Sequence, residues 1–333
     1  MEHTNIDILV VGAGLSGLMA ASILQKSGYR VTVLEKDPDI GGRALTLRIG
    51  NGLADVGAQF FTIRSSEFRS WVQQWEYEKV VSLWSTGFSH DSFTQASDGH
   101  PRYIANGGMS ALAYHLAHDL DDVRAGLAVM TATPTGENWL VQNEEGDIFT
   151  AQALVLTAPV PQSLAVLRAG ATHLSDNDTA ALNRIQYWPC VCGLFAIQGP
   201  LHLPEPGAVQ RPNAPISWIA DNHRKGISQT TLVTVHASSD YSRRIWGSSD
   251  ESILADLRDS LRPYIEPSTK IEEAHLIRWQ YSVPTIVHPA PYLLAEFLPP
   301  LIFAGDAFAG PRIEGAVMSG FAAAQKLLRV LES

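Results

Sequence analysis

A glycine-rich turn between a strand-like run and a helix-like run constrains this chain more than any other feature. The apolar residues 8–11 lead into Gly12-Ala13-Gly14-Leu15-Ser16-Gly17, and an amphipathic run continues to residue 27. In such a turn the first glycine permits the bend, the second lets the backbone approach a pyrophosphate, and the third lets helix and strand pack closely. The free N–H groups at the helix start favour phosphates. The sequence therefore predicts a βαβ dinucleotide-binding unit.

An acidic residue stands where such a unit needs one. The next expected strand, residues 30–34, ends at Glu35, eighteen residues beyond Gly17. A carboxylate at about this spacing meets the ribose hydroxyls of adenosine. It would repel a 2′-phosphate, so the pattern disfavours NADP in this site.

A second motif near the C-terminus separates FAD from NAD. The apolar residues 301–304 lead into Gly305-Asp306, and Glu314-Gly315-Ala316 open the last expected helix. Asp306 suits a ribityl hydroxyl, and the positive helix end would stabilise the negative charge on N1–C2=O of a reduced flavin. A dehydrogenase that binds only NAD has no need of this second site. The two motifs together predict FAD.

Further residues extend the expected cofactor site. Gly41-Gly42-Arg43 follows Glu35 as in flavoproteins of the amine-oxidase and glutathione-reductase type, and the arginine fork suits a diphosphate. Gln59 is expected to hydrogen-bond the flavin or a substrate carboxamide. The complete expected set of contacts to non-covalent FAD is Gly12, Gly14, Leu15, Ser16, Gly17, Glu35, Lys36, Gly42, Arg43, Gly57, Ala58, Gln59, Phe60, Val129, Gly305, Asp306, Glu314, Gly315 and Ala316.

Composition narrows the remaining possibilities. A length of 333 residues fits two domains, and 45% hydrophobic with 17% charged residues describes an ordinary globular protein. A formal net charge of −10 argues against nucleic-acid partners and against a basic membrane-binding face. The two cysteines, Cys190 and Cys192, are expected to be free thiols in a reducing compartment, and no metal-ligand spacing appears. We expect a cytoplasmic monomer or homodimer.

The order of expected elements indicates an α/β protein with a discontinuous first domain. Residues 1–62, 101–160 and 290–333 are predicted to form a Rossmann-like FAD-binding domain of the glutathione-reductase/amine-oxidase type. Residues 63–100 and 161–289 are predicted to form an α+β substrate domain on a mixed or antiparallel sheet. The expected helices are 15–27, 66–75, 111–119, 162–167, 251–261 and one opening at 314–316; the expected strands are 8–11, 30–34, 80–88, 127–133, 139–143, 148–151, 153–158, 191–197, 216–220, 231–236, 274–280 and 301–304.

The chain resembles the renalase-like proteins, in their bacterial branch, within the flavin amine-oxidase superfamily. Beside the two cofactor motifs, the resemblance is carried by residues 55–62 (DVGAQFFT), 102–110 (RYIANGGMS), 235–237 (VHA) and 278–279 (RW). It implies an FAD oxidase that converts 2- or 6-dihydro isomers of NAD(P)H to NAD(P)⁺ and reduces O₂ to H₂O₂. One departure is Ala307, where bacterial relatives often carry tryptophan beside the flavin.

The implied reaction needs flat apolar walls more than a strong base. As hydride leaves the dihydronicotinamide ring, the ring nitrogen supplies the electron push, so the enzyme must mainly orient the ring and exclude water. The resemblance implies that His236 and Trp279 line the pocket. Trp218, Phe60 and Phe61 are further candidates for the aromatic walls.

Two other functions remain open. An FAD-dependent amine oxidase would need an aromatic cage and usually a lysine–water pair near flavin N5; Lys225 and Lys270 are the only lysines of residues 161–289. A flavin dehydrogenase or desaturase would pass electrons to an acceptor other than O₂. The basic pairs at 224–225 and 243–244 are candidates to neutralise a substrate diphosphate.

Overall fold

The chain divides into two compact units, which we describe separately. The computed structural model describes residues 3–90 and 98–332. Unit 1 comprises Met1–Gly42, Leu112–Gln186 and Pro284–Ser333, and unit 2 comprises Arg43–Ala111 and Tyr187–Val283. Residues 43–62 and 101–111, expected in the first domain, thus group with unit 2. Residues 161–186 and 284–289, expected in the second domain, group with unit 1. Residues 91–97 of the expected second domain lie outside the described residues.

Unit 1 is built on a mixed sheet of eight strands. Its path runs β16-β17-β10-β1-β2-β7, with β9 added to the first half of β10 and β8 added to β9. The neighbours of β1 and the pair β10–β17 are parallel, and β8, β9 and β16 are antiparallel. The strands are β1 His3–Val11, β2 Val31–Leu34, β7 Val123–Arg124, β8 Val129–Thr135, β9 Asn138–Asn143, β10 Ile148–Leu156, β16 Leu293–Leu294 and β17 Leu301–Phe303.

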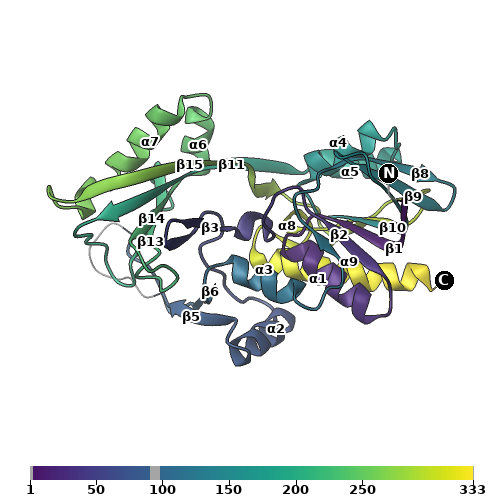
Figure 1. The fold of residues 1–333 in the computed structure, drawn as a ribbon, viewed down its shortest axis with the longest axis horizontal. Helices are drawn as coiled ribbons and strands as arrows, with labels where there is room; N and C mark the ends of the chain where they lie inside the picture. Colours follow the sequence, from purple (N-terminus) through teal and green to yellow (C-terminus); the bar gives the residue numbers. More distant parts are fainter. Residues whose placement is uncertain (1–2, 91–97, 333) are drawn as a thin grey trace. The chain divides into compact units, whose positions relative to one another are not determined.

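Two helices of unit 1 pack side by side, α1 in purple and α9 in yellow in Figure 1. Small residues permit this contact, because a Cβ on Gly320 of α9 would lie 2.1 Å from the carbonyl oxygen of Ser16 on α1. The Rossmann-like α/β class predicted for this region is confirmed. The helices of this unit are α1 Leu15–Lys26, α3 Ser110–Ala117 (its first two residues in unit 2), α4 Val160–Ala169, α5 Asp176–Asn183, α8 Asp306–Ala309 and α9 Ile313–Leu331.

Unit 2 is built on a five-stranded sheet in the order β12-β13-β14-β11-β15. Alternation along β14 gives the sheet two different faces: Val233 and Val235 join the core beneath α6 and α7, whereas Leu232 packs with Val56 on the other face. Its elements are β3 Thr46–Ile49, β4 Gly52–Asp55, α2 Ser66–Tyr77, β5 Val81–Ser85, β6 Arg102–Ala105, β11 Gln186–Gln198, β12 Ala208–Gln210, β13 Ile216–Asp221, β14 Leu232–Ala237, α6 Ser239–Ile245, α7 Asp250–Asp259 and β15 Lys270–Ile286, with short 3-10 turns at Gly42–Ala44 and Arg262–Tyr264.

Local patterns located most elements but merged or missed some. Residues 148–151 and 153–158, predicted as two strands, form the single strand β10, because β9 pairs with its first half and β17 with its second. The hairpin β3–β4 was not predicted, although Gly50 and Asn51 form its two-residue turn, a common hairpin signal. Cys190 and Cys192 are buried free thiols, as expected.

The described residues contain neither a membrane-spanning helix nor a cluster of metal ligands. No helix among residues 3–90 and 98–332 is both long and apolar enough to cross a membrane. Over the same ranges, no three or more His, Cys, Asp or Glu side chains gather as a metal site would require.

Candidate functional site

Four parallel strands of unit 1 end at one edge of its sheet. Val11 pairs with Leu34 on one side and with Leu156 on the other, and Leu156 pairs with Phe303. The residues that follow these strands therefore lie along the same edge. In open α/β sheets this carboxyl edge is where ligands bind.

The glycine turn after β1 is closed beneath and open above. Gly12 has φ +106°, and a Cβ there would lie 2.6 Å from Thr157 Oγ1; a Cβ on Gly17 would lie 1.9 Å from the Gly12 carbonyl oxygen. At Gly14, by contrast, a Cβ would meet nothing within 4 Å. Gly14 is half-buried but leaves open space on its Cβ side, where a pyrophosphate has to approach.

The start of α1 carries a buried hydroxyl that has no hydrogen-bond partner among the described residues. Its N-cap is Gly14, which offers no capping side chain, and its first turn carries no acidic residue. Leu15 and Ser16 are buried there, and the Ser16 hydroxyl has no hydrogen-bond partner among the described residues. Since buried polar groups are normally satisfied, an external acceptor such as a phosphate fits this helix end.

Glu35 follows β2 at the same edge and is buried. Its Oε2 accepts from the Ala13 N–H at 2.8 Å and its Oε1 from the Asp37 N–H at 3.1 Å. Burial raises the pKa of Glu35, and these two N–H groups oppose the rise. An ionised carboxylate offers about four acceptor positions, so capacity remains for ribose hydroxyls.

Of three other expected contacts, Gly42 lies beside this turn, and Lys36 and Val129 belong to the segments at and near Glu35. Gly42 would place a Cβ 3.5 Å from Gly14 Cα, so it borders the turn. Lys36 is exposed and pairs with Asp37. Val129 begins β8, whose approach is held by a hydrogen bond from the Leu127 N–H to the Glu35 carbonyl oxygen, 2.8 Å.

The C-terminal motif lies at the end of β17. The buried Gly305 donates its N–H to Ser319 Oγ, 2.8 Å away on α9, and Asp306 opens the four-residue α8. Glu314, Gly315 and Ala316 fall in the first turns of α9, a 19-residue helix that has no side-chain N-cap bond. The open backbone, the unpartnered hydroxyl and the placed carboxylate of this unit fit a dinucleotide.

The loop after β4 brings several expected residues together within unit 2. Arg43 Nη1 donates to the carbonyl oxygens of Tyr281 and Ser282 at 3.2 and 3.1 Å. The N–H of Ala58, next to Gly57, donates to the Arg43 carbonyl oxygen at 2.8 Å. These residues thus form one folded segment, and their expected contacts with FAD stay predictions.

Gln59 is engaged at both ends of its side-chain amide. Its Nε2 donates to the carbonyl oxygens of Asp55 at 2.7 Å and Gly57 at 3.2 Å, and its Oε1 accepts from Trp218 Nε1 at 3.2 Å. In this conformation the Gln59 amide stabilises the loop after β4 through these hydrogen bonds.

Trp218 and Phe60 belong to an aromatic cluster. Their ring centroids are 5.5 Å apart, and both contact Phe88, at 4.8 and 5.2 Å. Trp218 is only 5% exposed, whereas Phe60 is partly exposed. Phe60 therefore has the greater access to a ligand of the two. Phe61 is buried beside Phe68 and Tyr103.

His236 and Trp279 are held on a single backbone carbonyl. His236 Nε2 lies 3.2 Å from the Val56 oxygen, and Trp279 Nε1 donates to the same oxygen at 2.9 Å. Because a carbonyl only accepts, Nε2 carries the imidazole proton and Nδ1 is left as an acceptor. Burial lowers the pKa of His236 to about 4, so the ring is neutral near pH 7. The two side chains form the ring pair of this unit, and each is partly exposed.

The expected basic pairs have other partners. Arg224 contacts Glu205, and Arg243 contacts Asp240 and lies over the Trp188 ring. Lys225 is fully buried against Asp55, so its ammonium is not available to a diphosphate in solution.

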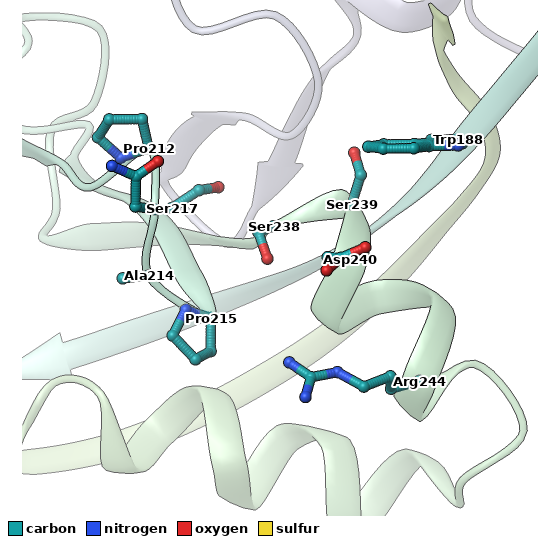
Figure 2. Close-up of a pocket in the computed structure, with 10 residues that line it drawn as sticks. Trp188, Pro212, Ala214, Pro215, Ser217, Ser238, Ser239, Asp240 and Arg244 are labelled. Carbon is teal, nitrogen blue, oxygen red and sulfur yellow. The ribbon is translucent and has the colours of Figure 1, made fainter.

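A pocket of about 570 Å³ in unit 2 lies beside α6 (Figure 2). Arg244 and Asp240 project toward it from the helix, and Trp188 borders it on β11. Neither His236 nor Trp279 lines this pocket. Of the expected basic pair at 243–244, Arg244 therefore lines a pocket that the ring pair does not line.

Sequence reasoning missed the ion pair between Asp55 and Lys225. Both side chains are 0% exposed, with Nζ 2.5 Å from Oδ2. The two residues are separated by 170 positions, so no local pattern links them. An acidic residue ending an apolar strand was the only available signal.

Comparison with known families decides the assignment. Residues 73–328 match the family "Flavin containing amine oxidoreductase", and residues 10–75 match an "NAD(P)-binding Rossmann-like domain". The chain belongs to the flavin-containing amine oxidoreductase family. It is an FAD-dependent oxidoreductase, and the expected cofactor and superfamily are confirmed. The α/β class with mixed and antiparallel sheets is confirmed as well.

Individual relatives of this family member differ in how much they share with it. Renalase of Mus musculus is 22% identical over 97% of this chain and 99% of its own length. The putative L-amino-acid oxidase YobN of Bacillus subtilis is 61% identical, but over 12% of this chain and 9% of its own length. Cyclohexylamine oxidase from Brevibacterium oxydans has the same fold, with a TM-score of 0.74 at 13% identity over 98% of this chain and all of that one. The likeness to renalase supports the expected renalase-like assignment.

Proposed function

We propose that this flavoprotein oxidises 2- or 6-dihydro isomers of NAD(P)H to NAD(P)⁺. The observation that carries the proposal is the neutral ring pair, His236 and Trp279, anchored on one carbonyl. The bound FAD would supply the hydride acceptor, flavin N5, and return the electrons to O₂ as H₂O₂.

The ring pair suits a substrate that needs orientation and no base. A dihydronicotinamide becomes aromatic as hydride leaves, and its own nitrogen drives that loss. A neutral histidine adds no charge beside the ring, while its Nδ1 can accept from a carboxamide N–H. The Trp279 face provides an apolar wall, and its bound Nε1 fixes the indole plane.

The extent of the relatives' similarity supports this choice. The match to mouse renalase runs through both units. The matches to two L-amino-acid oxidases, one of them putative, extend over 41 and 69 residues. These short matches cover only 12% and 20% of this chain. Support for a dihydronicotinamide as the hydride donor thus rests on mouse renalase, whose similarity also includes the second unit.

An amine oxidase is the second candidate, favoured by the family name and by structural neighbours such as putrescine oxidase, with a TM-score of 0.71 at 15% identity. It would usually use a lysine near the flavin. Within the described part of unit 2, Lys79 and Lys270 are exposed, and Lys225 is buried against Asp55. None has the partly buried, unpaired setting of a catalytic lysine.

Anaerobic stopped-flow mixing of the holoprotein tests the two candidates directly. The donors would be 2- and 6-dihydro-NAD(P), ordinary NAD(P)H, a primary amine and a polyamine. We expect rapid flavin bleaching by a dihydro isomer, then recolouring in air with one H₂O₂ per donor. Bleaching by amines alone would transfer the assignment to amine oxidase. Bleaching without recolouring in air would make the protein a dehydrogenase, and no bleaching would overturn the donor assignment.

A further inference from the structure

Asp55 and Lys225 form a completely buried ion pair that the proposed chemistry does not use. Taking two charges out of water is costly, and an apolar pair of similar volume often stabilises a fold equally well. Burial accordingly lowers the pKa of Lys225, opposed by the charge of Asp55. Stability alone gives little reason for a charged pair here.

The Asp55 carboxylate is held from three directions. Oδ1 accepts from Thr46 Oγ1 at 2.6 Å and from the Met109 N–H at 2.7 Å, and Oδ2 accepts from Lys225. The Lys225 ammonium also lies 5.1 Å from the centre of the Trp84 ring. Such charge-assisted bonds are short and directional, so they fix the position of the residue that accepts them.

The backbone beside this carboxylate carries the ring pair. The Asp55 carbonyl oxygen accepts from Gln59 Nε2 at 2.7 Å and from Thr234 Oγ1 at 2.9 Å. The next carbonyl, that of Val56, accepts from His236 and Trp279. A displacement of Asp55 would therefore move the carbonyl on which both rings depend.

We infer that Lys225 and Asp55 are positioning residues, whose ion pair fixes the Val56 carbonyl and through it the tautomer and placement of His236 and Trp279. The effect on turnover rests on the proposed function. The effect on the His236 tautomer does not, because it is present without substrate.

The test compares two matched double variants of the FAD-loaded protein. D55N/K225M removes both buried charges while keeping volume and the Oδ1 acceptor. R262M/D259N removes an exposed ion pair, with side chains 76% and 59% exposed, and is the control. Long-range ¹H–¹⁵N spectra report which His236 nitrogen carries the proton, and stopped flow reports the limiting rate of flavin reduction.

We expect D55N/K225M to lose the single Nε2–H tautomer and to reduce its flavin about 10- to 100-fold more slowly, with FAD still bound. The control should match the wild type in both readouts. An unchanged tautomer with a rate within about twofold of wild type would reduce the pair to a structural role and overturn the inference.

A milder variant decides the matter if D55N/K225M does not fold. T46V preserves shape but removes one donor to Asp55 Oδ1. It should show exchange between the two His236 tautomers and a smaller fall in the rate of flavin reduction. If T46V shows neither of these changes, the inference is contradicted. If no dihydronicotinamide reduces even the wild-type flavin, the proposed donor fails, while the tautomer result still decides the role of the pair.

Discussion

The two units obtain their functional groups in opposite ways. In unit 1 the cofactor turn is local: Ala13 and Glu35, joined by a hydrogen bond, are 22 residues apart. In unit 2 the ring pair depends on distant residues, since Val56 is 180 positions from His236 and 223 from Trp279. A local motif is recognisable in the sequence, whereas the second arrangement exists only after the sheet of unit 2 has formed.

The largest expected effect comes from a substitution that disrupts the glycine turn of unit 1. G17A should cost roughly 3 kcal/mol or more, because its Cβ would lie 1.9 Å from the Gly12 carbonyl oxygen and the backbone must shift. G14A should unfold like the wild type yet bind FAD less tightly, since its Cβ enters open space. G247A, also in open space but outside the motif, is the control. Chemical denaturation and FAD titration measure these effects, and equal stability of G17A and G14A would contradict the close contact.

A second effect concerns the protonation of His236 in unit 2 and its influence on stability. His236 has a pKa of about 4, below the 6.5 expected when unfolded, so between these pH values the unfolded state binds a proton that the folded state does not. The free energy of unfolding should therefore fall as pH drops from 6.5 to about 4, by up to about 3 kcal/mol from this residue. H236Q should lose that part of the fall, and the exposed H173Q should retain it. Identical pH profiles for wild type and H236Q would refute the neutral ring.

A third effect returns to unit 1. E35A should weaken FAD binding about 10- to 100-fold, because hydrogen bonds to a charged acceptor are lost. Asp37 is exposed and two residues away, so D37A is a matched control with little effect. Fluorescence titration of apoprotein with FAD measures both, and equal affinities of E35A and wild type would remove the ribose assignment.

The smallest expected effect is that the two cysteine thiols of the native protein do not react. Burial raises the pKa of Cys190 to about 12 and that of Cys192 well above its ordinary value. Reactive thiolates require a lowered pKa and access, so neither thiol should react with a chromogenic disulfide in native protein at pH 8. Two equivalents should react after denaturation. Fast reaction of the native protein would show that this face of the sheet opens.

The contrast between the units also explains what the sequence could predict. The turn at residues 12–17, the strand before Glu35 and the motif after residue 304 carry their meaning in neighbouring residue types, so the α/β class and FAD followed from them. Trp218 and Gln59 were proposed for the site from residue type alone, and the structure shows them bonded to each other. Residue type does not say which partner a side chain will find.

The ion pair of unit 2 marks the limit of such reasoning. Lys225 was considered for a diphosphate because it follows Arg224, and its ammonium is instead buried against Asp55. The domain boundaries show the same limit, because residues 43–62 follow the cofactor motif in sequence but their strand β4 packs beside β14. Long-range pairing sets both outcomes.

The central claim is that unit 1 binds FAD while the ring pair of unit 2 orients the substrate. The most direct test measures both flavin reduction and FAD binding in the variant W279F. W279F keeps an aromatic wall and loses the Nε1–H bond to the Val56 carbonyl, and W188F, in the same unit, is the control. We predict unchanged FAD stoichiometry and affinity, with anaerobic reduction by a dihydronicotinamide slowed about tenfold. Wild-type reduction kinetics, or loss of FAD without a change in the reduction rate of the protein that remains loaded, would contradict the account.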